Sequence, residues 1–315
     1  MVKFSKIAFL FPGQGAQYPG MGKSLFDAYP IVRETFEEGN DLLKRHLSKI
    51  ILQGPEEELT LTYNSQPAIY LLSLAYLKVL KALFPDLQPQ FCAGLSLGEY
   101  TALGASGTLP LDKGMILVEK RGRLMAEACQ KHPGTMAAVL GLDQKEIEAL
   151  VKEASLPHDL WAANFNAPGQ TVLSGTLKGV ERGSELAKQR GAKKVIPLTV
   201  QGAFHSGLMK SAEAPLEEKI EEISFQKSSI KVPMNASGHY FNSLGEMKAL
   251  LVKQVTHPVR WQENIETLEK EGIDLYLEIG CGKTLSSLNK RIGVKAPTLN
   301  FEKLEDLEQL AKEGR

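Results

Sequence analysis

Short apolar runs alternate along the chain with longer segments in which apolar side chains recur every three or four residues. The first run, Ile7–Phe11, ends at a Pro-Gly pair and is typical of a buried strand. The long segment Gln66–Phe84 places four large apolar side chains on one helical face. A second short run, Phe91–Ala93, precedes a helical segment that begins near Glu99. Strands that alternate with helices predict a mostly parallel sheet with helices on both faces, which is an α/β fold.

The pattern changes between residues 135 and 198. Four short β-rich runs enclose two amphipathic helical segments, and the turn sequence Asn-Ala-Pro-Gly separates the two middle runs. The order strand, helix, strand, strand, helix, strand is that of a ferredoxin-like unit. We therefore predict an α/β core of residues 1–130 and 201–315 with a small ferredoxin-like insert of residues 131–200. The predicted elements of the insert are Met136–Leu140, Gln144–Ala154, Trp161–Asn164, Thr171–Ser174, Lys178–Arg190 and Lys194–Leu198.

The rest of the core follows the same two periodicities. The predicted elements are helices over Leu111–Ala128, 208–223, Met247–Val255 and Ile265–Glu271 and a strand over Leu275–Ile279. We expect the charged C-terminal residues 302–315 to fray.

Composition excludes several classes of protein. The 315 residues carry 37 Lys and Arg against 37 Asp and Glu, so the formal net charge is zero. The chain therefore lacks the excess of Lys and Arg that is typical of proteins that bind nucleic acid or membrane surfaces. The longest mostly apolar stretch, Ala68–Leu77, is much shorter than the ~20 residues that span a bilayer. Three widely spaced cysteines without a CxxC pair argue against a disulfide framework and a zinc site. With no export signal visible, we expect a cytoplasmic protein that binds neither nucleic acid nor membrane.

The most informative motif is Gly94-Leu95-Ser96-Leu97-Gly98, between a predicted strand and a predicted helix. G-x-S-x-G in this setting is the pattern of a nucleophile elbow, in which glycines permit a tight turn that exposes the serine hydroxyl. The following helix N-terminus offers backbone N–H groups and a positive dipole end to a developing oxyanion. The alternative is a glycine-rich turn without a catalytic role. The strand before the motif and the helix after it favour Ser96 as a nucleophile.

A serine nucleophile needs a general base, and the chain has six histidines. His205 follows a predicted strand and a short loop, which places it where active sites form in α/β sheets. We predict His205 as the base, against the alternative of a structural histidine, and His257 fits a structural loop better. No acid stands out as the third group. Asp112, Asp143 and Asp159 have no telling context, and a backbone carbonyl would orient the imidazole equally well.

Two glycine-containing loops allow further functions. Residues 11–17 follow the first predicted strand and could cradle a phosphate, but Tyr18 stands where a dinucleotide fingerprint needs its third glycine. This loop could instead lend one N–H group to an oxyanion hole. Residues 280–284 end like a P-loop, but Leu277 occupies the position of its required first glycine. We therefore interpret 280–284 as a strand–turn–helix corner.

Taken in order, six segments resemble the malonyl-CoA:acyl carrier protein transacylase family over roughly residues 7–300. They are Phe-Pro-Gly-Gln-Gly-Ala-Gln at 11–17, Gly-Leu-Ser-Leu-Gly-Glu at 94–99, Glu-Lys-Arg-Gly at 119–122, Asn-Phe-Asn-Ala-Pro-Gly-Gln at 164–170, Phe-His-Ser at 204–206 and Pro-Val-Arg-Trp at 258–261. The resemblance implies an α/β-hydrolase-like core with a ferredoxin-like insert. It also implies that a malonyl group passes from coenzyme A to the phosphopantetheine thiol of acyl carrier protein, in fatty-acid synthesis.

The resemblance further implies the catalytic groups. Ser96 would be the acylated nucleophile, and His205 would be its general base and acid, oriented by backbone carbonyls rather than by an aspartate. The backbone N–H groups of Gln14 and Leu97 would form the oxyanion hole. No bound cofactor or metal is implied, because the thioester already carries an activated acyl group.

Substrate binding is implied for three more residues. Arg121 would bind the free carboxylate of the malonyl group, Gln254 would line the site near His205, and Phe204 is the variant of its motif that goes with malonyl units. One position departs from the family: Leu95 stands where a histidine usually precedes the serine. Leucine neither donates a hydrogen bond nor carries charge, so rate and fine specificity are affected rather than the nucleophile.

The expected partners are malonyl-CoA and, transiently, acyl carrier protein. We expect a monomer, although no pattern in the sequence fixes the oligomeric state. The basic residues Lys188, Arg190, Lys193 and Lys194 are one candidate docking surface for an acidic carrier protein, with a solvated helix end as the alternative. Two other functions stay open: a serine esterase or thioesterase, which would share nucleophile and base, and a non-catalytic module that binds carrier protein.

Overall fold

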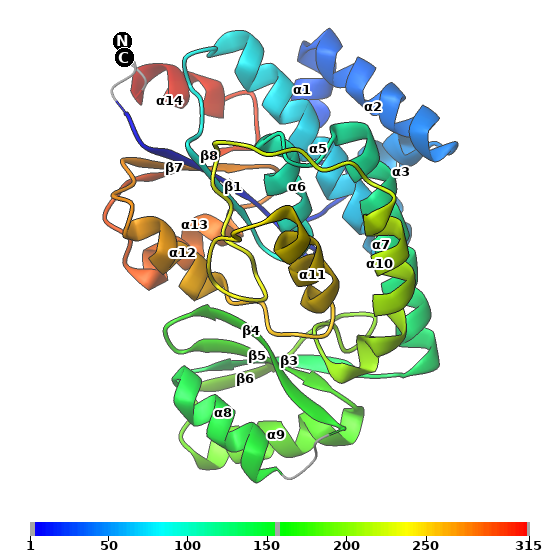
Figure 1. Ribbon diagram of the computed structural model, residues 1–315, viewed down its shortest axis with the longest axis vertical. Helices are drawn as coiled ribbons and strands as arrows, with labels where there is room; N and C mark the ends of the chain where they lie inside the picture. Colours follow the sequence, from blue (N-terminus) through cyan, green and yellow to red (C-terminus); the bar gives the residue numbers. More distant parts are fainter. Residues whose placement is uncertain (1–3, 155–157, 314–315) are drawn as a thin grey trace. The chain divides into compact units, whose positions relative to one another are not determined.

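The computed structural model describes residues 4–154 and 158–313, and the chain divides into two compact units (Figure 1). We name them by their sheets. The parallel-sheet unit comprises Met1–Gly122, Ile223–Pro233 and Ile265–Arg315, and the antiparallel-sheet unit comprises Arg123–Glu222 and Met234–Asn264.

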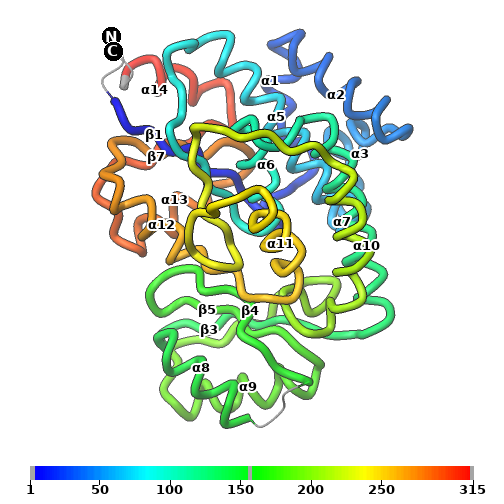
Figure 2. Tube along the Cα trace, in the orientation of Figure 1, coloured from blue at the N-terminus to red at the C-terminus, as the bar shows by residue number. Residues whose placement is uncertain are grey.

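The sheet of the parallel-sheet unit has the strand order β2-β1-β7-β8, and all its neighbouring strands are parallel. Figure 2 shows that β1 and β7, which are far apart in the sequence, run side by side. Every residue of β1 is buried, as expected for a continuous apolar strand covered on both faces. The strands are β1 (Ile7–Phe11), β2 (Phe91–Gly94), β7 (Leu275–Ile279) and β8 (Thr298–Phe301).

Helices surround this sheet, and α6 packs against both β1 and β2. The helices are α1 (Lys23–Ala28), α2 (Pro30–Leu43), α3 (Leu47–Gln53), α4 (Glu56–Thr60), α5 (Thr62–Leu83), α6 (Leu97–Ala105), α13 (Thr284–Ile292) and α14 (Asp306–Glu313), together with the first half of α7 (Leu111–Lys131). The predicted corner at residues 280–284 is confirmed as the connection between β7 and α13.

Helix α5 continues through Pro67 in its first turns. Proline has no N–H group, so the carbonyl of Tyr63 loses its helical donor. Nη2 of Arg45 donates to that carbonyl at 2.9 Å and replaces the missing bond. The helix therefore stays intact around Gln66, the residue before the proline.

The antiparallel-sheet unit has the strand order β4-β5-β3-β6. With the chain order strand, helix, strand, strand, helix, strand, this confirms the predicted ferredoxin-like architecture. Helices α8 and α9 cover one face of the sheet (Figure 1) and close an apolar core that includes Ile147, Leu173 and Leu186. The elements are β3 (Thr135–Leu140), α8 (Gln144–Glu153), β4 (Leu160–Ala167), β5 (Gln170–Gly175), α9 (Leu177–Gln189), β6 (Lys194–Pro197), the 3₁₀ helix η1 (Gly207–Ala212), α10 (Glu213–Glu221), α11 (Leu244–Gln254) and the start of α12 (Trp261–Glu269).

Two predicted segments are wrong in detail. The helix expected over 208–223 begins as η1, and α10 starts only at Glu213. This start places Pro215 in the first turn of α10, where its missing N–H is not needed. Of the C-terminal residues 302–315 expected to fray, 306–313 form α14, because Leu307 and Leu310 are buried; 314 and 315 lie outside the described residues. The antiparallel-sheet unit is wider than the insert of residues 131–200, whose limits stay a prediction.

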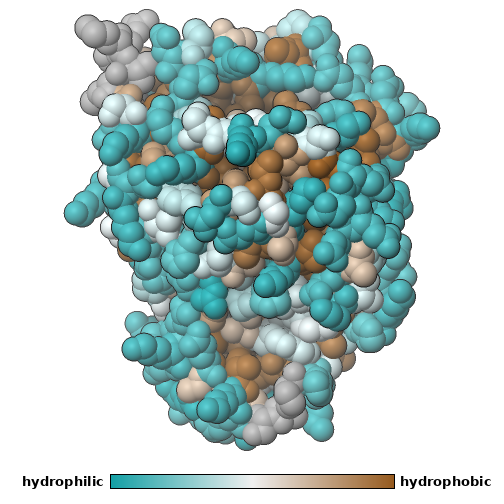
Figure 3. All heavy atoms as spheres, viewed as in Figure 1, coloured by the Kyte–Doolittle hydropathy of each residue, from teal (hydrophilic) through white to brown (hydrophobic). Residues whose placement is uncertain are grey.

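Hydrophilic side chains make up most of the molecular face drawn in Figure 3. Within residues 4–154 and 158–313, no helix is both long and apolar enough to cross a membrane. The same residues contain no group of three or more His, Cys, Asp and Glu side chains arranged to hold a metal ion.

Candidate active site

Ser96 lies between the end of β2 and the start of α6, with φ 55° and ψ −101°. A side chain at positive φ is strained by about 1–3 kcal/mol, and such strain is typical of a nucleophile elbow. The chain thus turns sharply from strand to helix at the predicted nucleophile.

The backbone around Ser96 is packed too closely for side chains. A Cβ atom on Gly94 would lie 1.9 Å from the carbonyl of Gly98. A Cβ atom on Gly98 would lie 2.1 Å from the carbonyl oxygen of Phe11, at the end of β1. The N–H of Leu95 donates to this same oxygen at 3.1 Å. Both glycines of the motif are therefore required by contacts between main chains.

Arg121, on α7, contacts the nucleophile. Its Nη2 donates to Oγ of Ser96 at 3.1 Å, and its Nη1 donates to Oε1 of Gln66 at 2.5 Å. The arginine is 1% exposed, and burial lowers the pKa of its guanidinium. The ring of Tyr100 lies 5.3 Å below the guanidinium carbon, which favours the charged form. A cation is thus fixed beside the serine hydroxyl.

Helix α7 reaches this position because Gly122 lets it approach α5. A Cβ atom on Gly122 would lie 2.8 Å from the carbonyl oxygen of Thr62 and 2.9 Å from Cα of Tyr63. The close approach brings the neighbouring Arg121 within reach of Gln66. The Arg-Gly pair in the segment 119–122 therefore has a packing reason.

The two predicted oxyanion-hole residues adjoin the elbow. Leu97 is the first residue of α6, where N–H groups have no acceptor within the helix. Gln14 follows Gly13. A Cβ atom added to Gly13 would lie 2.3 Å from the carbonyl oxygen of Leu95. The Gln14 side chain donates through Nε2 to Oγ1 of Thr62 at 3.2 Å.

The prediction missed Gln66. It is 1% exposed and bonded to Arg121, in a helix whose buried positions are mostly apolar. A buried amide at the first position of the apolar periodic segment Gln66–Phe84 was the available signal. That signal does not reveal which group the amide contacts.

His205, in the antiparallel-sheet unit, is also strained, because its φ is 56°. Its side chain is buried, with 4% exposure. Its Nδ1 lies 2.7 Å from the backbone carbonyl oxygen of Gln254. A carbonyl only accepts, so Nδ1 carries a proton, and in the neutral imidazole Nε2 is then the basic nitrogen. The group that orients the imidazole is thus a main-chain carbonyl. Asp143, one of the acids considered above, instead caps α8 by accepting from the N–H of Glu146.

The neighbours of His205 are buried in the same unit. Phe204 is 8% exposed, and the side chain of Gln254 is fully buried, with Nε2 3.3 Å from Oδ1 of Asn235. His257, the other histidine considered, is exposed and has Nδ1 2.9 Å from the carbonyl oxygen of Lys253.

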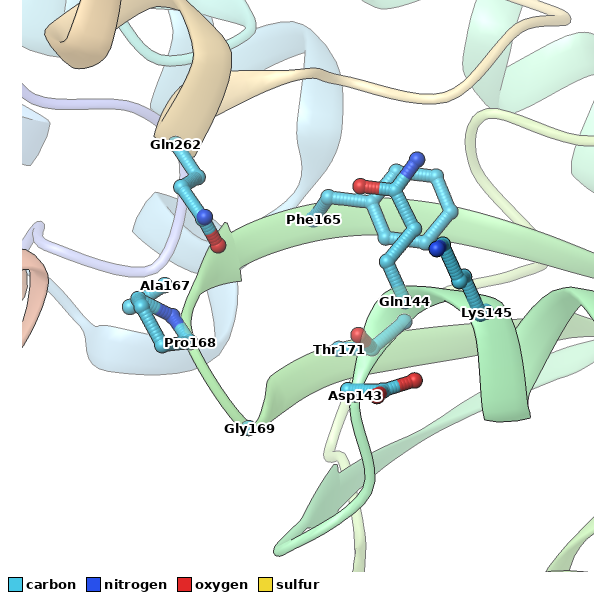
Figure 4. A pocket seen from close by; sticks show the side chains of 9 residues that line it. All are labelled: Asp143, Gln144, Lys145, Phe165, Ala167, Pro168, Gly169, Thr171 and Gln262. Carbon is cyan, nitrogen blue, oxygen red and sulfur yellow. The ribbon is translucent and has the colours of Figure 1, made fainter.

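The antiparallel-sheet unit contains a cavity of about 310 Å³. Figure 4 shows the side chains that line it. The start of α8 and the turn between β4 and β5 form its wall, and Gln262 points in from α12. Part of the motif at 164–170 lines this cavity, but none of the predicted site residues does.

The structure therefore groups the predicted residues by unit. Ser96, Arg121, Gln14 and Leu97 belong to the parallel-sheet unit, together with Leu95 and Gln66, and Ser96 and Arg121 are in direct contact. His205, Phe204 and Gln254 belong to the antiparallel-sheet unit, where His205 contacts Gln254.

Comparisons with known proteins identify the family of the chain. The family model described as acyl transferase domain matches residues 8–290. A malonyl CoA-acyl carrier protein transacylase of Bacillus subtilis (strain 168) is 43% identical over 305 residues, 96% of each chain. The solved structure of the malonyl CoA-acyl carrier protein transacylase of Coxiella burnetii superposes with a TM-score of 0.95 at 36% identity, covering 100% of this chain and 99% of that one. A malonyl-transacylase solved in complex with a type II polyketide synthase acyl-carrier protein gives a TM-score of 0.93 at 36% identity, covering 98% and 99%. The chain belongs to the acyl transferase domain family, among its malonyl CoA-acyl carrier protein transacylases.

Proposed function

We propose that this protein transfers a malonyl group from coenzyme A to the phosphopantetheine thiol of acyl carrier protein, in fatty-acid synthesis. The observation that carries the proposal is the contact between Arg121 and Ser96. A buried cation beside a nucleophile favours an acyl group that brings its own negative charge. The free carboxylate of a malonyl thioester, close to the carbonyl under attack, meets this requirement. The names of the relatives support the same substrate.

In the proposed mechanism, Oγ of Ser96 attacks the thioester carbonyl while Nε2 of His205 takes the hydroxyl proton. The N–H groups of Gln14 and Leu97 stabilise the oxyanion, and Arg121 binds the malonyl carboxylate through two parallel hydrogen bonds. The carbon–sulfur bond then breaks, and His205 returns the proton to the coenzyme A thiolate.

The second half of the proposed reaction reverses these steps with another thiol. His205 takes the proton from the phosphopantetheine thiol of the carrier protein, whose sulfur attacks the malonyl-Ser96 ester. When the carbon–oxygen bond breaks, the proton returns to Oγ. We assign Phe204 and Gln254 to the substrate-binding wall on the His205 side. No cofactor takes part in this scheme, because acyl transfer between thiols needs none.

The remaining expectations belong to the same proposal. We infer a cytoplasmic monomer that meets acyl carrier protein transiently, and light scattering tests its oligomeric state. For the docking surface we retain Lys188, Lys193 and Lys194, which are exposed. Arg190 contributes less to such a surface, because its guanidinium is hydrogen-bonded to Glu153.

The test is to trap the acyl-enzyme with labelled malonyl-CoA. We expect the wild type to retain label in stoichiometric amount and Ser96→Ala to retain none, because alanine has no nucleophile. Adding a phosphopantetheine thiol should move the label to that thiol rather than to water. Label that passes mainly to water would identify a thioesterase instead. Failure of the wild type to label would favour a non-catalytic binding module.

A further inference from the structure

Gln66 stands at the end of a buried polar stretch of α5 that also includes Asn64 and Ser65. It lies on α5 and is 1% exposed, and the residues that follow it, Pro67, Ala68 and Ile69, are buried and apolar. A buried amide destabilises a protein by about 1–3 kcal/mol unless its polar atoms are hydrogen-bonded. The hydrogen bonds of the Gln66 amide offset this cost.

Those contacts fix the direction of the amide. Arginine carries only donors, so Gln66 must turn Oε1 toward Nη1 of Arg121, at 2.5 Å. Its Nε2 then faces Oε1 of Gln14 at 3.5 Å, and Nε2 of Gln14 faces Oγ1 of Thr62 at 3.2 Å. Each donor in this series of hydrogen bonds, from Arg121 to Thr62, faces an acceptor. A flipped amide at Gln66 would place two donors against each other.

Hydrogen bonds also fix the position of the Arg121 guanidinium. Arg121 uses Nη1 on Gln66 and Nη2 on Ser96, so its plane is held at two points. A planar fork held in this way needs little further ordering to accept a carboxylate from an acyl group on Ser96. An amide has a further property that matters here: it solvates the cation without neutralising it. A carboxylate at the same position would pair with Arg121 and compete with the substrate.

We infer that Gln66 is a positioning residue that holds the guanidinium of Arg121 ready for the acyl carboxylate, and that it thereby sets the preference for malonyl over uncharged acyl groups. This inference rests on the function proposed above. It assigns Gln66 a role in substrate selection in addition to joining α5 to α7.

The experiment compares the kcat/KM values for malonyl-CoA and acetyl-CoA. Gln66→Met keeps the length of the side chain but removes the acceptor. We expect it to lower the malonyl-to-acetyl ratio by about tenfold to a hundredfold, the usual effect of losing a hydrogen bond to a charged group. The loss should fall mainly on KM for malonyl-CoA, because the carboxylate is bound equally in the ground and transition states.

Gln66→Glu gives the sharper result. The introduced carboxylate would pair with Arg121, so the ratio should fall at least as far as in Arg121→Ala, which is measured alongside. Ser73→Ala is the matched control. Ser73 is another buried polar residue of α5, and its Oγ donates to the carbonyl of Ile279, so it joins the helix to β7 without contacting Arg121. Its loss should leave the ratio unchanged.

The outcomes separate this inference from the proposed function. If the wild type prefers malonyl and Arg121→Ala abolishes the preference while both Gln66 variants keep it, Gln66 has no positioning role. Equal losses for both substrates in Gln66→Met would likewise reduce it to a packing residue. If the wild type itself shows no preference for malonyl-CoA, the proposed function fails and the inference fails with it.

Discussion

Each unit holds one predicted catalytic residue at positive φ, but the two units do so by different means. Ser96, at φ 55°, is held by contacts between main chains: the elbow packs against the end of β1, and Gly94 and Gly98 leave no room for a Cβ atom. His205, at φ 56°, is held by polar contacts. Its Nδ1 is bonded to the carbonyl of Gln254, 49 residues later in the chain.

The segment around His205 is fixed in the same polar manner. Oγ of Ser206 donates to the carbonyl of Ala203 at 2.6 Å and accepts from the N–H of Leu208 at the start of η1. The comparison shows two ways to stabilise a strained residue. Close backbone packing requires glycine at particular positions. A hydrogen bond to a main-chain carbonyl requires only that some residue, of any type, places its carbonyl within reach. In the parallel-sheet unit, substitutions of Gly94 and Gly98 should therefore impair the site. In the antiparallel-sheet unit, the sensitive position should be His205 itself.

The largest effect is expected for His205→Ala. Removing a positioned general base should slow acylation by about 10²- to 10⁴-fold. His257→Ala is the matched control, because that imidazole is exposed and contacts the end of α11, the helix that precedes it. Single-turnover labelling with malonyl-CoA measures both rates. A normal rate in His205→Ala with a slow rate in His257→Ala would move the base to the other histidine.

The two ways of holding a strained residue also explain what the sequence could predict. Ser96 was recognisable because backbone crowding leaves glycines at fixed spacing, and the ferredoxin-like unit because β3, α8 and their neighbours keep regular apolar periods. The sequence does not indicate which main-chain carbonyl bonds to His205, because every residue type has a carbonyl group. His205 was therefore predicted from its position and from the resemblance of the segment 204–206 to the family, and its catalytic role stays a prediction.

Other parts of the molecule were missed for related reasons. Helices α1, α3 and α4 have only six, seven and five residues, so no long period marks them. The 14-residue helix α2 buries Val32 and Phe36 on one face but was not predicted from the sequence. The strand β8 has only four residues. Gln66 was visible as a polar residue in an apolar segment, but its contact with Arg121 depends on the approach of α7 at Gly122, which only the assembled fold reveals.

A smaller but still large effect is expected for Gly98→Ala, which tests the backbone-packing half of the comparison. The added Cβ atom would lie 2.1 Å from the carbonyl oxygen of Phe11, so α6 or β1 must move. A displacement of about 1 Å at the nucleophile should slow acylation by about a hundredfold.

Gly104→Ala is the control for this substitution, on the same helix. Its Cβ atom would meet side-chain atoms of Leu111 and Tyr70 at 3.1 Å, and side chains yield more easily than backbone. We expect a rate near that of the wild type. Circular dichroism confirms that both variants fold. Equal rates in the two variants would show that the elbow is not held by backbone contacts.

The smallest effect is expected for Gln254→Met, which tests the polar half of the comparison. The substitution keeps the side-chain volume and the backbone carbonyl, so the hydrogen bond to Nδ1 of His205 should survive. It removes the side-chain donor from Oδ1 of Asn235, a buried loss of about 1–3 kcal/mol in stability. Acylation should therefore stay within about tenfold of the wild type while the melting temperature falls, since the base keeps its orientation and methionine still fills this part of the proposed substrate-binding wall. The measurements are single-turnover acylation and thermal unfolding of the same preparation. A loss of acylation as large as that of His205→Ala, in a protein that is still folded, would show that the Gln254 side chain, rather than its carbonyl, supports the base.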